Sequence, residues 1–218
     1  HQMSPELGLM FAVALGLYGI AMALRRPAAG GALLGLAIGV GFLAYGFLGL
    51  LWIGSAAMLL PLAGNSWRTG AYALTLAVAA LVALPLAAAW PLALWLRSPE
   101  LFEAWRQSES LREYLGFLPE AAATDPMLFA KNMVWFAWPA WPLVAWTLWV
   151  RGRGFHGGWN VPGVTLPVAM SLVILVGLWV MPAPRVAQAL PLLVPLALLA
   201  SVEVDSLERG MSAALDWF

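Results

Sequence analysis

The residues best suited to chemistry in this sequence are a few arginines and carboxylates. Arg185 lies in the segment Met-Pro-Ala-Pro-Arg, between two apolar stretches. A guanidinium can bind a phosphate through two hydrogen bonds at once, so this side chain could bind a phosphate group. A long basic side chain at a helix end can equally extend to lipid headgroups with no specific ligand. Both interpretations fit the residues around Arg185.

A second polar group is formed by Glu109, Arg112 and Glu113, within the longest polar segment of the chain. One interpretation is a constellation that faces a substrate at the membrane surface. The other is a solvated helix face, on which the charges pair at i,i+3 and i,i+4 spacing. The spacing by itself favours the solvated face.

The composition excludes several classes of protein. The chain has 218 residues, of which 62% are hydrophobic and 10% are charged, whereas a soluble domain carries about 25% charged residues. This composition indicates a polytopic membrane protein. Eleven basic residues balance eleven acidic ones, so a nucleic-acid partner is not expected. With no cysteine and two histidines, neither a disulfide nor a metal site is expected.

Apolar stretches of roughly 20 residues can each cross a bilayer as an α-helix. The sequence predicts an all-α, polytopic membrane helix bundle of about seven segments, in a single transmembrane domain over residues 1–218. The expected segments are 7–24, two short helices within 30–63, 69–90, 128–150, 161–181 and 187–202. The stretch 30–63 is too long for one span, and we expect it to break at Tyr45-Gly46. Pro91 is expected to end the segment 69–90.

Arginines in the short connections indicate the orientation of the segments. With a break at Tyr45-Gly46, one side, expected to be cytoplasmic, receives Arg25, Arg26, Arg68, Arg151, Arg153 and Arg209. The polar segment 97–127 then lies outside the cytoplasm.

The polar segment 97–127 opens with Ser98-Pro99-Glu100, which combines an N-cap residue, a proline at the first helical position and an acid in the first turn. We expect an amphipathic helix there, lying along the membrane surface.

Gly31, Gly35 and Gly39 form a run of small residues at four-residue spacing within an apolar helix. Such a run lets two membrane helices approach closely. It predicts a seam either between two copies of the chain or inside one bundle. The internal seam is expected, because a polytopic bundle needs such contacts itself.

Three blocks of the sequence resemble integral-membrane glycosyltransferases related to lipid A aminoarabinose transferase and the protein O-mannosyltransferases. The first block is 35–46, GLAIGVGFLAYG. The second is Trp90-Pro91, followed by Leu101-Phe102-x-x-Trp105 and Tyr114-Leu115-Gly116-Phe117. The third and most specific is 185–200, RVAQALPLLVPLALLA, with Leu207-x-Arg209-Gly210 and 214–218, ALDWF, after it.

The resemblance implies a GT-C-like bundle in the bacterial inner membrane, surrounded by the lipid bilayer. Such an enzyme moves a sugar from a polyprenyl-phosphate donor to an extracytoplasmic acceptor, which is a lipid, a glycan or a protein. It implies no cofactor. Arg185 matches a basic residue that the family places near the lipid phosphate, which favours the phosphate-binding interpretation.

The sequence departs from the family at several of the implied substrate positions. Tyr45 stands where the family often has Lys, and Gln188 stands where an aromatic residue, often Tyr, is usual. Around Glu109 the family tends to have a polar pair followed by an Arg, and Arg112 lies one place away from that Arg. The candidate residues for substrate and lipid phosphate are therefore Arg185, Arg112, Glu109, Tyr45 and Gln188.

The family's catalytic carboxylate, an acidic pair just after the first span, has no match in this sequence. The catalytic residue is therefore unknown, and the chain is expected to be the middle to C-terminal part of the membrane domain. The competing interpretation is a non-enzymatic polytopic membrane protein, either part of a transporter or a structural subunit. Ion-coupled transporters usually place ionisable residues in mid-span, whereas Glu203 and Asp205 lie at a span end.

Overall fold

The computed structural model describes residues 4–108, 131, 134–181 and 186–204. The residues in these ranges form helices, turns and connections, and none of them is in a strand. The all-α class predicted from the sequence is confirmed for this part of the chain.

The first three helices are α1 (Pro5–Ala23), α2 (Pro27–Tyr45) and α3 (Phe47–Ala63). Gly46 separates α2 from α3 with a φ of 60°, a left-handed conformation that glycine adopts at little cost. Its N–H donates to the Phe42 carbonyl at 2.8 Å and so caps α2. The predicted break at Tyr45-Gly46 is confirmed.

A short 3-10 helix, η1 (Asn65–Trp67), leads to α4 (Gly70–Arg97). Thr69 caps α4, because its hydroxyl accepts a hydrogen bond from the Tyr72 N–H at 3.2 Å. The expected end at Pro91 is wrong, since α4 continues through this proline. A proline removes one backbone hydrogen bond, and membrane helices tolerate this loss when the flanking turns persist. The helix α5 (Pro99–Ser108) begins where the Ser98-Pro99 signal predicts.

The remaining helices are α8 (Ala140–Gly152), η2 (Phe155–Asn160), α9 (Pro162–Val180), η3 (Val186–Leu192) and α10 (Leu193–Val202). Helix α9 agrees with the expected segment 161–181. The expected segment 128–150 is not one continuous helix, because a turn at 137–139 precedes α8. The expected helix 187–202 begins as the 3-10 helix η3, because Pro191 has no N–H to donate to an α-helical ladder.

Four helices in the described part of the chain are long and apolar enough to cross a membrane, namely α1, α2, α4 and α9. Helix α3 and the stretch 186–202 are also apolar but shorter. The chain therefore has the helices of a multi-pass membrane protein.

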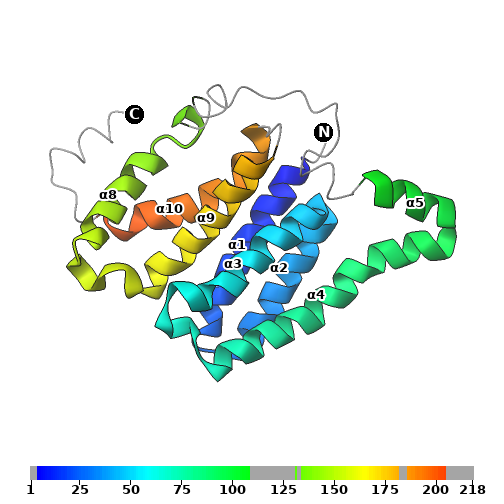
Figure 1. Cartoon of the computed structure of the whole chain (residues 1–218), viewed down its shortest axis with the longest axis horizontal. Coiled ribbons are helices and arrows are strands. Elements are labelled where there is room, and N and C mark those ends of the chain that lie inside the picture. The colour runs from blue at the N-terminus through cyan, green and yellow to red at the C-terminus, as the bar shows by residue number, and fades with distance from the viewer. Residues whose placement is uncertain (1–3, 109–130, 132–133, 182–185, 205–218) are drawn as a thin grey trace.

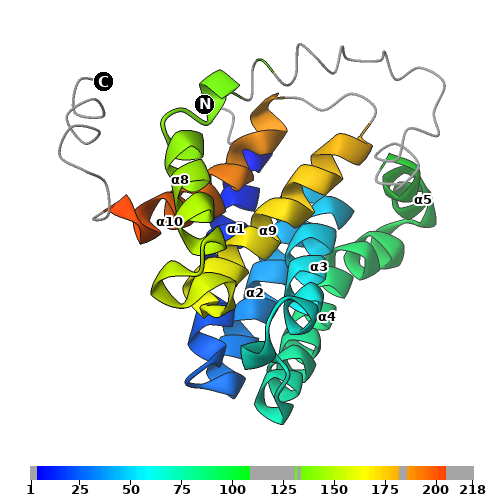
Figure 2. The same cartoon turned by 60° about the vertical axis from the view of Figure 1, so that its left-hand side comes forward.

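The helices begin and end at two opposite ends of the bundle, which we name after Tyr45 and Arg151 (Figures 1 and 2). The Tyr45 end holds the α2–α3 turn, α5 and the last turn of α9. The Arg151 end holds the α1–α2 turn, η1 and the end of α8. The connections of the Arg151 end carry Arg25, Arg26, Arg68, Arg151 and Arg153, which the sequence predicts to share one side of the membrane.

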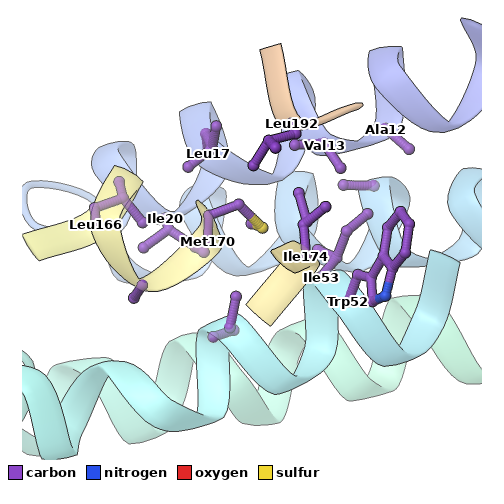
Figure 3. Packing of buried hydrophobic residues seen from close by; sticks show 14 of the residues in the cluster. Ala12, Val13, Leu17, Ile20, Trp52, Ile53, Leu166, Met170, Ile174 and Leu192 are labelled. Carbon is purple, nitrogen blue, oxygen red and sulfur yellow. The ribbon is translucent and has the colours of Figure 1, made fainter. Parts of the chain in front are cut away.

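Helix α1 contacts α2, α3, α9, η3 and α10 through its buried face. Its residues Leu9, Val13 and Ile20 are fully buried. Figure 3 shows the core around them, to which α3 contributes Ile53 and α9 contributes Ile174. Helix α1 thus joins the N-terminal helices to the C-terminal ones.

The glycine run of α2 packs against α4. A Cβ added to Gly31 or Gly35 would lie 2.5 Å from the carbonyl oxygen of Thr75 or Ala79, and one added to Gly39 would lie 2.7 Å from the Leu86 Cβ. Real Cβ atoms do not approach other atoms this closely, so only glycine permits the observed spacing. The seam lies inside the bundle, as expected.

Candidate functional site

Two of the predicted substrate residues meet at the Tyr45 end of the bundle. Tyr45 is the last residue of α2, and Gln188 lies in η3. The Gln188 Nε2 donates a hydrogen bond to the Tyr45 hydroxyl at 2.9 Å, and both side chains are half-buried. Tyr45 and Gln188 are two of the positions at which the sequence departs from the glycosyltransferases that it resembles, and their contact joins the first of the three blocks to the third.

The elements on both sides of this contact are fixed by the core. Gly46 ends α2 directly after Tyr45. The neighbours of Gln188 in η3, Ala189 and Leu192, are buried against the bundle, and η3 contacts α1 and α9. The contact is therefore held by packed helices rather than by a surface loop.

The Tyr45–Gln188 pair can hydrogen-bond a phosphate oxygen or a sugar hydroxyl, but both side chains are neutral at pH 7. The positive charge that a phosphate site requires would have to come from elsewhere, and Arg185 precedes Gln188 by three positions in the sequence. Arg185, Arg112 and Glu109 lie outside the described residues.

The second block contacts the first at the same end. Trp105 of α5 packs against Phe42 of α2 and Phe47 of α3, with both pairs of ring centroids 6.4 Å apart. Trp90 of α4 and Trp105 line a pocket of about 350 Å³ with residues of the α2–α3 turn. Segments of all three blocks that resemble the glycosyltransferases thus meet at the α2–α3 turn.

An apolar groove runs between α3 and α9. Near the Tyr45 end it has a volume of about 400 Å³ and is lined by residues that include Leu48 and Met181. A second cavity of about 350 Å³ continues it toward Trp159, and the two share Leu59 and Leu172. Many of the lining side chains are exposed, so the groove opens on the outer surface of the bundle, where a bilayer would lie.

A buried ion pair lies at the Arg151 end. The Arg151 Nε and the Glu203 Oε1 are 2.7 Å apart, and the side chains are 9% and 3% exposed. One helical turn earlier in both helices, the Thr147 hydroxyl donates to the Leu199 carbonyl at 3.0 Å. Helices α8 and α10 therefore run parallel, with their C-terminal ends held together.

Sequence reasoning missed this pair, because it used Arg151 only as an indicator of orientation and Glu203 only as a residue at a span end. The sequence does contain a signal for this ion pair. Two predicted spans that run in the same direction end in opposite charges, at Arg151 and at Glu203, and parallel spans in one bundle can bring such ends together.

The amphipathic helix α5 carries an exposed ion pair. The Arg106 Nη2 lies 2.6 Å from the Glu103 Oε1, and the Arg106 Nε donates to Oε2 of the same carboxylate at 2.9 Å. Hydrogen bonds from Arg106 and Gln107 lower the pKa of Glu103 from 4.5 to about 2. Glu109, Arg112 and Glu113, for which the spacing favours a solvated face, lie outside the described ranges, and that interpretation stays a prediction.

Within the described ranges, no group of three or more His, Asp or Glu residues gathers as a metal site would require. Comparison with known proteins finds no match to a family model, to a curated protein or to a solved structure.

Proposed function

We propose that this chain is part of an integral-membrane glycosyltransferase that moves a sugar from a polyprenyl-phosphate donor to an extracytoplasmic acceptor. The observation that supports this proposal is the convergence of the three resembling blocks. The Tyr45–Gln188 contact joins the first block to the third, and the Phe42–Trp105 contact joins the first to the second. In the proposal, the seven apolar segments cross the bacterial inner membrane, and the Tyr45 end faces away from the cytoplasm.

The geometry suggests where such a donor would bind. Its phosphate would lie near the Tyr45–Gln188 pair, where two neutral hydrogen-bonding groups assist the guanidinium of Arg185. Its prenyl chain would follow the α3–α9 groove, which begins beside Leu48, just after the α2–α3 turn. The groove suits a prenyl chain because its lining is apolar over its length and open to the bilayer.

The implied reaction is a displacement at the anomeric carbon. A carboxylate deprotonates the acceptor, the acceptor oxygen bonds to that carbon, and the polyprenyl phosphate leaves with the electron pair of the broken bond. Arg185 would stabilise the negative charge on the departing phosphate. Arg112 and Glu109 would help to shape the cavity above it, and the carboxylate itself would come from residues without a match in this sequence.

The proposal is tested by lipid binding to the purified protein in detergent, measured by native mass spectrometry. Undecaprenyl phosphate should bind more tightly than dioleoyl phosphatidic acid, which carries a phosphate on unbranched acyl chains. Arg185→Ala should weaken the binding of undecaprenyl phosphate about 10- to 100-fold, the equivalent of roughly 1.5–3 kcal/mol for a charged hydrogen bond. Arg185→Lys should recover part of it, because an ammonium cannot make the two-point contact.

A substitution in the α3–α9 groove tests whether the prenyl chain binds there. Leu172→Trp places a large ring in the α3–α9 groove and should weaken binding of undecaprenyl phosphate. Leu198→Trp, at an exposed position of α10 outside the groove, is the matched control and should leave binding unchanged. The proposal would be refuted if undecaprenyl phosphate and dioleoyl phosphatidic acid bind with equal affinity and if Arg185→Ala leaves both affinities unchanged.

The alternative is a non-enzymatic membrane protein, either part of a transporter or a structural subunit. The buried Arg151–Glu203 pair is the observation that bears on it, because buried ionisable residues in membrane helices often mark ion pathways. The pair lies at the ends of α8 and α10 rather than in mid-span, which favours a structural role. Proton or sodium flux into vesicles that contain the protein, abolished by Glu203→Gln, would favour the transporter.

A further inference from the structure

A pocket of mixed polarity lies at the Tyr45 end, between α2, α4 and α5. Its volume is about 350 Å³, and its lining consists of Phe42, Leu43, Ala44, Gly46, Trp90 and Trp105. Every one of these side chains is aliphatic or aromatic, or is absent in the case of glycine. The polar part of the wall therefore comes from main-chain groups and from the indole N–H groups.

The aromatic part of the wall is held in place by ring contacts. Trp105 packs against Phe102 at 6.1 Å and against Phe42 and Phe47 at 6.4 Å, and the Phe42 and Phe47 rings meet edge to face at 5.5 Å. Trp90 adds a second indole from α4. Indole faces carry negative electrostatic potential and attract cations, tryptophan most strongly among the aromatic residues.

The main-chain part of the wall is the C-terminal end of α2. Leu43 and Ala44 lie in the last turn of this helix, where carbonyl groups point out of the helix end. Helix α3 begins at the same turn, with Gly46 as its N-cap, so its N-terminal dipole offsets that of α2, and the α2 carbonyl groups themselves supply the acceptors. The pocket thus combines hydrogen-bond acceptors and aromatic faces, both of which favour a positive ligand.

We propose that this pocket binds a primary ammonium group, carried either by a lipid headgroup or by a free amine. A primary ammonium supplies N–H donors for the α2 carbonyls and a positive charge for the indole faces. Sugar rings are commonly held by hydroxyl, amide or carboxylate side chains, and none of the described lining residues has such a group. This inference is independent of the proposed glycosyltransferase function.

The charged groups on the nearest helix do not oppose such a ligand. Arg106 of α5 is paired with Glu103 at 2.6 Å, so the pair adds no net charge to this face. Arg97, at the end of α4, is exposed to solvent. The volume of about 350 Å³ also exceeds that of a bare inorganic ion and leaves room for the carbon atoms next to the nitrogen.

The test compares phospholipids that differ only in the headgroup. Dioleoyl phosphatidylethanolamine, its mono- and dimethyl derivatives, phosphatidylcholine and phosphatidylglycerol are titrated onto the purified protein and followed by native mass spectrometry. The ethanolamine lipid should bind about tenfold more tightly than the glycerol lipid, which has hydroxyl donors but no cation. Affinity should fall with each added methyl group, because each removes one N–H donor.

Substitutions of Trp90 and Trp105 test whether the ammonium group binds in this pocket. Trp90→Leu and Trp105→Leu should each remove most of the preference for ethanolamine over glycerol, whereas Trp105→Phe, which keeps an aromatic face, should retain part of it. Trp179→Leu is the matched control, because Trp179 is 81% exposed at the same end of the bundle and lies outside the pocket lining. It should leave the preference intact.

A soluble competitor distinguishes the two sources of the ammonium group. Displacement of the bound lipid by millimolar ethanolamine would assign the pocket to free amines as well, and a lack of displacement would assign it to the lipid headgroup alone. The proposal is overturned if the ethanolamine and glycerol lipids bind equally, if phosphatidylcholine binds most tightly, or if the preference survives both leucine variants.

Discussion

Two buried side chains of opposite charge, Arg151 and Glu203, hold the C-terminal ends of α8 and α10 together. Both are almost fully shielded from solvent, so neither charge is compensated by water. In such pairs the attraction between the partners largely offsets the cost of removing them from water. The loss of one partner is therefore much more destabilising than the loss of both.

We expect Glu203→Leu and Arg151→Met to lower the free energy of unfolding by about 3–5 kcal/mol each, because each leaves an uncompensated buried charge. The double variant Arg151→Met/Glu203→Leu should be more stable than either single variant. The measurement is thermal or detergent-induced unfolding of the purified protein, followed by circular dichroism. Additive losses in the double variant would show that the two side chains do not act as a pair.

The residue contacts were the least predictable part of the site. Tyr45 and Gln188 were singled out separately, each as a departure from a family pattern, and nothing in their local sequence joins them. Their hydrogen bond depends on how α2 and η3 pack around α1, which is a property of the tertiary structure. The Arg151–Glu203 pair differs, because two predicted spans that run in the same direction end in these opposite charges.

At the scale of single helices, the seam between α2 and α4 depends on the absence of side chains. A Cβ on Gly35 would lie 2.5 Å from the Ala79 carbonyl oxygen, so Gly35→Ala should force α2 and α4 apart. We expect a loss of about 1–3 kcal/mol in the free energy of unfolding, as for overpacked cores. Gly54→Ala in α3 is the matched control, since no atom lies within 4 Å of its added Cβ. This control should be neutral or slightly stabilising, because alanine favours helix.

The exposed pair on α5 predicts a specific pH dependence. The pKa of Glu103 is lowered to about 2 in the folded chain, so the stabilisation from this carboxylate is fully present above its ordinary pKa of 4.5 and is lost as the pH falls toward about 2. In carboxyl carbon NMR of glutamate-labelled protein, the Glu103 carboxylate should titrate near pH 2. Arg106→Gln should return that titration toward 4.5, and high salt should do so in part.

The helix boundaries were predictable where local chemistry decides them. Gly46 ends α2 and Ser98-Pro99 separates α4 from α5, because these residues constrain their own backbone. Pro91 was misleading, since one missing hydrogen bond does not end a helix whose other bonds persist. Pro191 had the opposite effect, and it lies in a 3-10 helix where a continuous α-helix was expected.

At the scale of the whole molecule, the arginines predict the orientation in the membrane. We expect the Tyr45 end to face outward, because Arg25, Arg26, Arg68, Arg151 and Arg153 lie in the connections of the other end. The chain has no cysteine, so single cysteines can be placed without a background signal. In intact cells, an impermeant thiol reagent should label Ser108→Cys and Ser110→Cys but not Gly157→Cys. The reverse pattern would invert the orientation.

The parallel arrangement of α8 and α10 has a consequence for biogenesis. A ribosome makes Arg151 well before Glu203, so the guanidinium of α8 lacks this carboxylate until α10 has been synthesised. We therefore expect α8 to settle into its final position only after α9 and α10 have been made. A nascent chain that stops before Glu203 should retain an uncompensated charge at Arg151, and we expect it to be degraded faster than the whole chain.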